Sequence, residues 1–306
     1  MASSTDIADP APMAQAAEGA PRSVCRLGAP LGEGPVWVAR DRAIWFVDII
    51  GHKLHRFDPA TGALKSWDTP GPPGWILPSR DGRFVVGMQR GLNSFDPATG
   101  GFASLGAVEP DLPGNRLNDA TVDPAGRIWF GSMDEAQAKP TGRVYVHAHG
   151  VTRDCGLAPV TITNGPAVSP DGRTLYHVDT LGQVIHEIPV HDDATLGTPR
   201  PFVRIEPGAG SPDGPTVDSE GCLWIGLYGG WAARRYAPDG ALVQTVTFPV
   251  ANVTKIAFGG ADLRTAFATT ARTGLDAAAL AKQPAAGDLF AFRVDVPGLP
   301  VRTFEG

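Results

Sequence analysis

Three short segments of the sequence carry an acidic or amide side chain followed by the same two residues, Gly and Pro. They are Glu33-Gly34-Pro35, Asn164-Gly165-Pro166 and Asp213-Gly214-Pro215. In each segment the polar residue lies eight residues before a residue of a predicted turn, and the pair Asn118-Asp119 begins at the same distance before another turn. This shared spacing predicts that four oxygen-bearing side chains occupy equivalent positions of a repeated structure.

Carboxylates and amides crowded at one place suit a divalent cation. Without a cation, the charged oxygens would repel and desolvate each other. The candidate donors are all hard oxygens, with no His or Cys in the same register, which favours Ca²⁺, Mg²⁺, Mn²⁺ or Fe²⁺. Three protein ligands would leave positions free for water and substrate, as in catalytic metal sites. The alternative is that these Asn and Asp residues serve turns, where both are common.

The elements that must position these side chains form an internal repeat. Six segments share a polar turn followed by an apolar, aromatic-rich run of strand character. They span residues 39–48, 79–88, 123–132, 169–178, 218–227 and 260–269, and their turns are 41 to 49 residues apart. A second repeat follows each segment. In the first two periods it contains the hexapeptide FDPATG, and in all six it is typical of a β-hairpin.

A strand pair followed by a hairpin makes four antiparallel strands per period, which is the unit of a β-propeller. Six periods predict an all-β fold, a six-bladed β-propeller with four-stranded antiparallel blades. The inner strands of a propeller line its central channel, so we expect the four oxygen-bearing side chains at one mouth of that channel. One helix is expected, at residues 274–282. The alternative is one or two β-sandwiches, whose strands recur at shorter intervals without the longer period.

The composition limits the partners of this 306-residue chain. Its net charge of −6 disfavours nucleic acid, which needs a basic face, and also anionic membrane surfaces. No apolar run reaches the length of a membrane span. Three widely separated Cys residues favour free thiols over disulfides or a zinc site. Residues 1–23 lack the features of a secretory signal, so we expect a flexible N-terminal tail there and one propeller domain over residues 24–306 of a cytoplasmic protein.

Several long motifs resemble the senescence marker protein/gluconolactonase family, which includes regucalcin and bacterial aldonolactonases. They are LGEGPVW (31–37), RLNDATVDPAGRIWFGSM (116–133), ITNGPAVSPDGRTLYHVD (162–179), SPDGPTVDSEGCLWIGLYGG (211–230) and NVTKIAFGG (252–260). The resemblance covers residues 24 to 304 and is greatest to bacterial sugar-acid lactonases such as xylonolactonase. It implies a six-bladed propeller, in agreement with the number of repeats.

The resemblance also implies roles for individual residues. Those that match the metal ligands of the family are Glu33, Asn164 and Asp213. Asp213 also matches the proposed general base, and Arg116 and Asn118 match residues that bind the sugar lactone beside the metal. Some members carry a substrate-contacting Glu where this sequence has Ala136, with Glu135 just before it. The specificity pocket therefore departs from the family pattern, whereas the metal centre matches it.

These implied roles predict a metal-dependent lactonase. It would open the ring ester of an aldonolactone, such as xylono-, arabinono- or gluconolactone, to the aldonic acid. The expected cofactor is one divalent ion, Ca²⁺, Fe²⁺, Mn²⁺, Mg²⁺ or Zn²⁺, and the expected partner is the small-molecule sugar lactone, bound by a monomer or weak homo-oligomer. Two alternatives remain open: a broad esterase or phosphotriesterase-like hydrolase on the same metal site, and a non-catalytic calcium-binding propeller.

Other polar and aromatic residues have structural explanations. Five histidines on predicted strands or hairpin turns are expected to be hydrogen-bonded or solvated rather than catalytic: His147, His149, His177, His186 and His191. Ser211 precedes a proline and does not lie in a GxSxG segment, so nothing supports a serine hydrolase. Three tryptophans recur at matched positions of the repeat and are expected in the blade cores: Trp45, Trp129 and Trp224.

Overall fold

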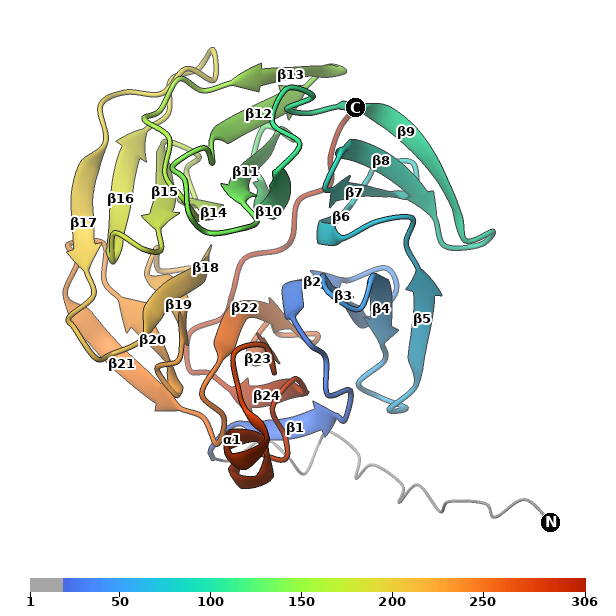
Figure 1. The fold of residues 1–306 in the computed structure, drawn as a ribbon, viewed down its shortest axis with the longest axis vertical. Coiled ribbons are helices and arrows are strands. Elements are labelled where there is room, and N and C mark those ends of the chain that lie inside the picture. The colour runs from blue at the N-terminus through green and yellow to red at the C-terminus, as the bar shows by residue number, and fades with distance from the viewer. Residues whose placement is uncertain (1–18) are drawn as a thin grey trace.

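Four-stranded antiparallel sheets are the repeated unit of the structure, a computed structural model that describes residues 19–306. Four such sheets follow one another along the chain (Figure 1). The first two contain β2 (Gly32–Val38), β3 (Ala43–Asp48), β4 (Lys53–Phe57), β5 (Leu64–Asp68), β6 (Pro73–Pro78), β7 (Phe84–Met88), β8 (Gly91–Asp96) and β9 (Gly101–Ala107). The next two contain β10 (Asn115–Val122), β11 (Ile128–Asp134), β12 (Val144–Ala148), β13 (Val151–Asp154), β14 (Thr163–Val168), β15 (Thr174–Asp179), β16 (Val184–Pro189) and β17 (Arg200–Arg204).

The remaining strands form one eight-stranded sheet. It contains β18 (Ser211–Val217), β19 (Leu223–Tyr228), β20 (Ala232–Tyr236), β21 (Leu242–Thr247), β22 (Val253–Gly259), β23 (Thr265–Thr270), β24 (Leu289–Arg293) and β1 (Arg22–Cys25). Two antiparallel runs of four strands meet in it at a single parallel pair, Gly214 opposite Lys255. The predictions of an all-β fold and of four-stranded antiparallel units are confirmed.

The first strand of each four-strand run lies at the centre of the molecule, and we call these six the inner strands (Figure 1). They are β2, β6, β10, β14, β18 and β22. Each inner strand contacts the next one in this order, and β22 contacts β2, so the ring closes on itself. Side chains at the same height on different inner strands can therefore meet around one axis.

The cores between the sheets are built on a repeated Trp–Asp contact. Trp45, Trp129 and Trp224 are fully buried on β3, β11 and β19, as predicted. Their indole N–H groups donate to turn carboxylates at 2.8–3.0 Å, and the pairs are Trp45 with Asp41, Trp129 with Asp123 and Trp224 with Asp218. Because a buried indole N–H needs a partner, each Asp fixes the orientation of its Trp and the turn before the strand.

The two ends of the described chain close the ring. β1 pairs antiparallel with β24. Residues 1–18 lie outside the described residues, and the boundary predicted for the tail is wrong at its end, because Arg22 and Ser23 of the 1–23 segment belong to β1. The only helix within residues 19–306 is α1 (Ala277–Lys282), inside the range predicted for it and between β23 and β24. It is too short to span a bilayer, so no described helix is a candidate membrane span.

The histidines lie away from the inner strands, in agreement with a structural role, although not all are fully hydrogen-bonded. The imidazole Nδ1 of His147 on β12 lies 2.9 Å from the Thr152 hydroxyl. His177 on β15 is buried, and its Nε2 has no partner within the described residues. Burial lowers the pKa of His177 to about 4, so this side chain is neutral at physiological pH.

Candidate active site at one end of the channel

The four predicted oxygen donors lie in the first halves of four inner strands and are buried. Glu33 is on β2, Asn118 on β10, Asn164 on β14 and Asp213 on β18. In each strand the pairing register shifts at this position, which is the signature of a β-bulge. A bulge redirects a side chain out of the regular alternation of a strand. The repeated Gly-Pro pair is the local sequence that accompanies this irregularity in three of the strands.

A chain of hydrogen bonds connects three of these strands. Arg116 Nη1 donates to Asn118 Oδ1 at 2.6 Å, and Asn118 Nδ2 donates to Asn164 Oδ1 at 3.0 Å. Asn164 Nδ2 donates to Thr180 Oγ1 at 2.9 Å, and this hydroxyl donates to the carbonyl of Pro212, the residue before Asp213. The structure therefore brings the predicted sugar-binding pair into contact with one predicted metal ligand.

The two carboxylates of the site are buried with few donors. Glu33 accepts one hydrogen bond, from the amide of Gly34 at 2.8 Å, and no group among residues 19–306 donates to the Asp213 carboxylate. Burial, followed by the charge of Asp119, raises the pKa of Glu33 to about 7. Burial, then the charges of Glu33 and Asp119, raises the pKa of Asp213 well above its ordinary value. The site holds negative charge at a high energetic cost.

A buried ion pair lies next to the two carboxylates. Lys255 Nζ on β22 donates to Asp119 Oδ1 on β10 at 2.5 Å, and both side chains are more than nine-tenths buried. Lys255 was not identified from the sequence as a site residue. The signal for it was the position of NVTK in the repeat, because Lys255 follows the inner-strand position of Thr254 as Asp119 follows Asn118.

Glu135, which directly follows β11, lies near Arg116. It accepts a hydrogen bond from Gln89 Nε2 at 3.0 Å. Burial lowers the pKa of the Arg116 guanidinium, and the charges of Glu135, Glu33 and Asp213 oppose that shift. Glu135 is thus close enough for its charge to act on Arg116. In some family members the substrate-contacting Glu stands one position later, where this sequence has Ala136.

The donor set fits a divalent metal ion. Glu33 and Asp213 are carboxylates without a bonded cation, and one lone pair of Asn164 Oδ1 remains after its bond to Asn118. Within residues 19–306 there is no cluster of three or more His, Cys, Asp or Glu side chains placed to bind a metal. The candidate site has only two carboxylates and takes its third donor from an amide, which suits a hard cation that prefers oxygen.

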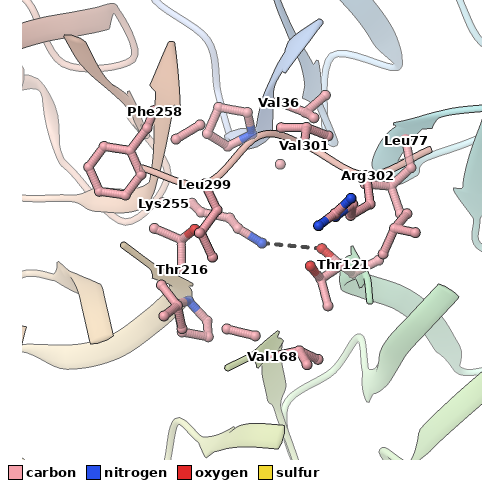
Figure 2. A pocket seen from close by; sticks show the side chains of 18 of the residues that line it. Val36, Leu77, Thr121, Val168, Thr216, Lys255, Phe258, Leu299, Val301 and Arg302 are labelled. Atoms are coloured by element: carbon pink, nitrogen blue, oxygen red, sulfur yellow. Dashed lines mark hydrogen bonds between the residues drawn. The ribbon is translucent and has the colours of Figure 1, made fainter. Parts of the chain in front are cut away.

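A cavity of about 160 Å³ occupies the channel beyond this site. Its walls are the middle and later parts of the inner strands, and the C-terminal segment Leu299–Arg302 crosses it (Figure 2). Figure 2 shows the Lys255 ammonium extending from its strand toward Thr121 on the opposite wall. The carboxylates Glu33 and Asp213 do not line this cavity. Lys255 and its partner therefore stand between the candidate site and the cavity.

Comparisons with known proteins identify the family of the chain. The family described as "SMP-30/Gluconolactonase/LRE-like region" matches residues 31–272. The chain is 33% identical to the 6-deoxy-6-sulfogluconolactonase of Pseudomonas putida, over 93% of this chain and 98% of that protein. It is 34% identical to the L-arabinolactonase of Azospirillum brasilense, over 90% and 92%.

A solved structure of another protein has the same fold as this chain. The crystal structure described as a calcium-binding protein, regucalcin, from Agrobacterium tumefaciens superposes with a TM-score of 0.90. The two sequences are 29% identical, and the match covers 94% of this chain and 98% of that one. With a family match over most of its length and relatives of this similarity, the chain is a member of the SMP-30/gluconolactonase family, as its motifs predicted.

Proposed function

We propose that this protein is a six-bladed β-propeller that hydrolyses a sugar-acid lactone to the aldonic acid with the help of one divalent metal ion. The observation that supports it best is the buried cluster in the first halves of four inner strands. Two carboxylates with raised pKa values, Glu33 and Asp213, share this cluster with the hydrogen-bonded series Arg116, Asn118 and Asn164. Counting the eight-stranded sheet as two blades makes six.

Each residue of the cluster has a defined part in the proposed reaction. Glu33, Asn164 and Asp213 would hold the cation, which when bound polarises the lactone carbonyl as a Lewis acid. Arg116 would donate hydrogen bonds to the lactone, and Asn118 Oδ1 would accept one from a lactone hydroxyl, because both hydrogens of Asn118 Nδ2 are already donated to Thr163 O and Asn164 Oδ1. These contacts would fix the position of the lactone. The Asp213 carboxylate accepts a proton from the attacking water as the water oxygen adds to the carbonyl carbon. The ring C–O bond then breaks, and the leaving alkoxide takes up the proton.

The relatives indicate the substrate class. The names of the Pseudomonas and Azospirillum proteins specify a hexonolactone and a pentonolactone, so a panel of both classes is the appropriate assay. A second candidate is calcium binding without catalysis. The structural relative described as a calcium-binding protein favours it. The two candidates differ in whether a lactone is consumed in the presence of metal.

The test combines acid release from a lactone panel with metal analysis of two variants. Wild-type protein stripped by chelator and reloaded with Ca²⁺, Mn²⁺, Fe²⁺, Mg²⁺ or Zn²⁺ should release acid from at least one lactone. Asp213→Ala should lose both bound metal and activity. Arg116→Ala should keep the metal but lose about 10²-fold in kcat/KM, because a hydrogen bond to a charged donor contributes about 1.5–3 kcal/mol.

Two results would contradict the proposal. Normal metal content in Asp213→Ala would show that the metal binds elsewhere. Metal binding by the wild-type protein with no turnover of any lactone would favour calcium binding without catalysis.

A further inference from the structure

The positions that directly follow the candidate donors form a second layer around the channel. Three of them are glycines: Gly34, Gly165 and Gly214. The matching positions on β10 and β22 are Asp119 and Lys255, the only charged residues in this layer. The position on β6 is Trp75. The three glycines leave room for side chains to cross the channel, and the two charged residues use that room.

The crossing is direct because β10 and β22 are three steps apart in the closed ring of six inner strands and therefore face each other. The Lys255 ammonium reaches Asp119 Oδ1 across the axis. The stem of Lys255 passes over Gly214, where a Cβ atom would lie 2.7 Å from Lys255 Cβ and Cγ. The glycine after Asp213 is thus required by the position of Lys255.

The pair also holds the backbone beside the candidate donors. Asp119 Oδ2 accepts the Gly165 amide at 3.0 Å, and Gly165 directly follows Asn164. Asp119 Oδ1 accepts the Ala120 amide at 2.8 Å, which fixes the bulge that carries Asn118. One ion pair therefore contacts the chain next to Asn118, Asn164 and Asp213.

We propose that Lys255 and Asp119 are positioning residues that cross-link opposite sides of the channel and hold Asn118, Asn164 and Asp213 in their catalytic arrangement. The inference rests on the proposed lactonase function. Lys255 also holds the Asp119 carboxylate in an ion pair. Without the ammonium, this third carboxylate would be free to turn toward the site as a competing ligand, and Gly165 would lose its acceptor.

The test uses Lys255→Met, which keeps the length of the stem but removes the ammonium. We expect kcat on the best lactone to fall about 10²-fold, the effect of a small displacement of reacting groups, with KM changed less than about 3-fold. Lys255→Arg restores a charged donor and should recover kcat to within about 10-fold of wild type. Hydrogen exchange at the Gly165 amide, followed by mass spectrometry, should become at least about 10-fold faster in Lys255→Met.

The matched control is Arg235→Met. Arg235 and Asp218 also form a buried ion pair, at 2.7 Å, but on β20 and outside the channel. This control should lower stability while leaving kcat and Gly165 exchange unchanged. If Lys255→Met does not fold, Lys255→Gln replaces it with the same readouts and the same expected changes.

The outcomes separate the inference from the proposed function. Wild-type kcat and unchanged Gly165 exchange in Lys255→Met overturn the positioning role. Equal kcat losses in Lys255→Met and Arg235→Met also overturn it, because the effect would then be general destabilisation. A wild-type protein that opens no lactone contradicts the proposed function instead, and Gly165 exchange still decides whether Lys255 holds this backbone.

Discussion

At the scale of single residues, the dominant feature of the site is the burial of Glu33 and Asp213 beside each other. Burial raises the pKa of both carboxyls above their ordinary values. For an acid, a raised pKa in the folded state means that the folded protein holds a proton that the unfolded chain has already released. Stability from this source is therefore present at low pH and lost as the pH rises.

The first prediction follows for metal-free protein. The Glu33 pKa rises from 4.5 to about 7 on folding, so its contribution to the free energy of unfolding should fall between these pH values. Glu33→Gln lacks this titration. Between pH 5 and pH 8, the free energy of unfolding of the variant should rise relative to that of wild type by on the order of 3 kcal/mol, since one pKa unit corresponds to about 1.4 kcal/mol. Urea unfolding of both proteins at each pH measures the difference.

The comparison with Glu33→Gln is needed because buried histidines act in the opposite direction. Burial lowers the pKa of His55 and His177 to about 4, so both favour folding increasingly as the pH rises toward 6.5. Excess divalent cation should remove the advantage of Glu33→Gln at pH 8, because the cation stabilises the ionised carboxylate. Parallel stability curves for the two metal-free proteins would contradict the assigned environment of Glu33.

At the scale of elements, the inner strands combine a bulge with a close contact across the channel. Gly214 pairs with Lys255 in the only parallel strand pair within residues 19–306. A side chain on Gly214 would overlap the Lys255 stem, and three of its atoms would lie within 2.8 Å of the new Cβ. The glycine is therefore a requirement of packing between β18 and β22 rather than of turn formation.

The second prediction concerns Gly214→Ala. The added methyl group should lower the free energy of unfolding by about 1–3 kcal/mol, the usual cost of overpacking, and should reduce kcat by displacing Lys255. Gly71→Ala is the matched control, because no atom lies within 4 Å of the Cβ it would add. Thermal unfolding and lactone hydrolysis measure both variants. A Gly214→Ala protein as stable and active as Gly71→Ala would contradict the close packing.

At the scale of the whole molecule, the C-terminal segment fastens several sheets together. Gly298 bridges to Asp218, and Phe304 bridges to Ser79 on the other side of the channel (Figure 1). Phe304 is buried in a core cluster and lies 5.3 Å from the His147 ring. Because the segment crosses the end of the channel away from Glu33, it contributes to stability without touching the candidate site.

The third prediction separates these two roles. Phe304→Ala should lower the free energy of unfolding by about 3 kcal/mol, as for other buried Phe side chains, and leave kcat unchanged. Glu305→Gln removes only an exposed ion pair with Arg80 and should cost less than about 1 kcal/mol. Urea unfolding with a parallel lactone assay tests both. A drop in kcat for folded Phe304→Ala would show that the two ends of the channel are coupled.

Much of the fold was predictable because local signals repeat. Each polar turn followed by an aromatic-rich strand can be identified from adjacent residues, and Trp129 with Asp123 shows why, since the two side chains pair within one turn and strand. Arg22 and Ser23 of β1 were placed in the predicted tail because the four residues of this strand, Arg22–Cys25, carry no pattern of their own. Their partner, β24, lies at the other end of the chain.

The sequence by itself determined the repeat, the register of Glu33, Asn164 and Asp213, and the family. Turn chemistry and strand alternation act between neighbouring residues, and motifs are read directly from them. Only the tertiary structure decided that Lys255 meets Asp119, because 136 residues separate them and no local pattern records which inner strands face each other. The closure of the ring of inner strands places the two residues opposite each other. The same closure buries the two carboxylates together and thereby raises their pKa values, an effect of desolvation that exists only in the folded chain.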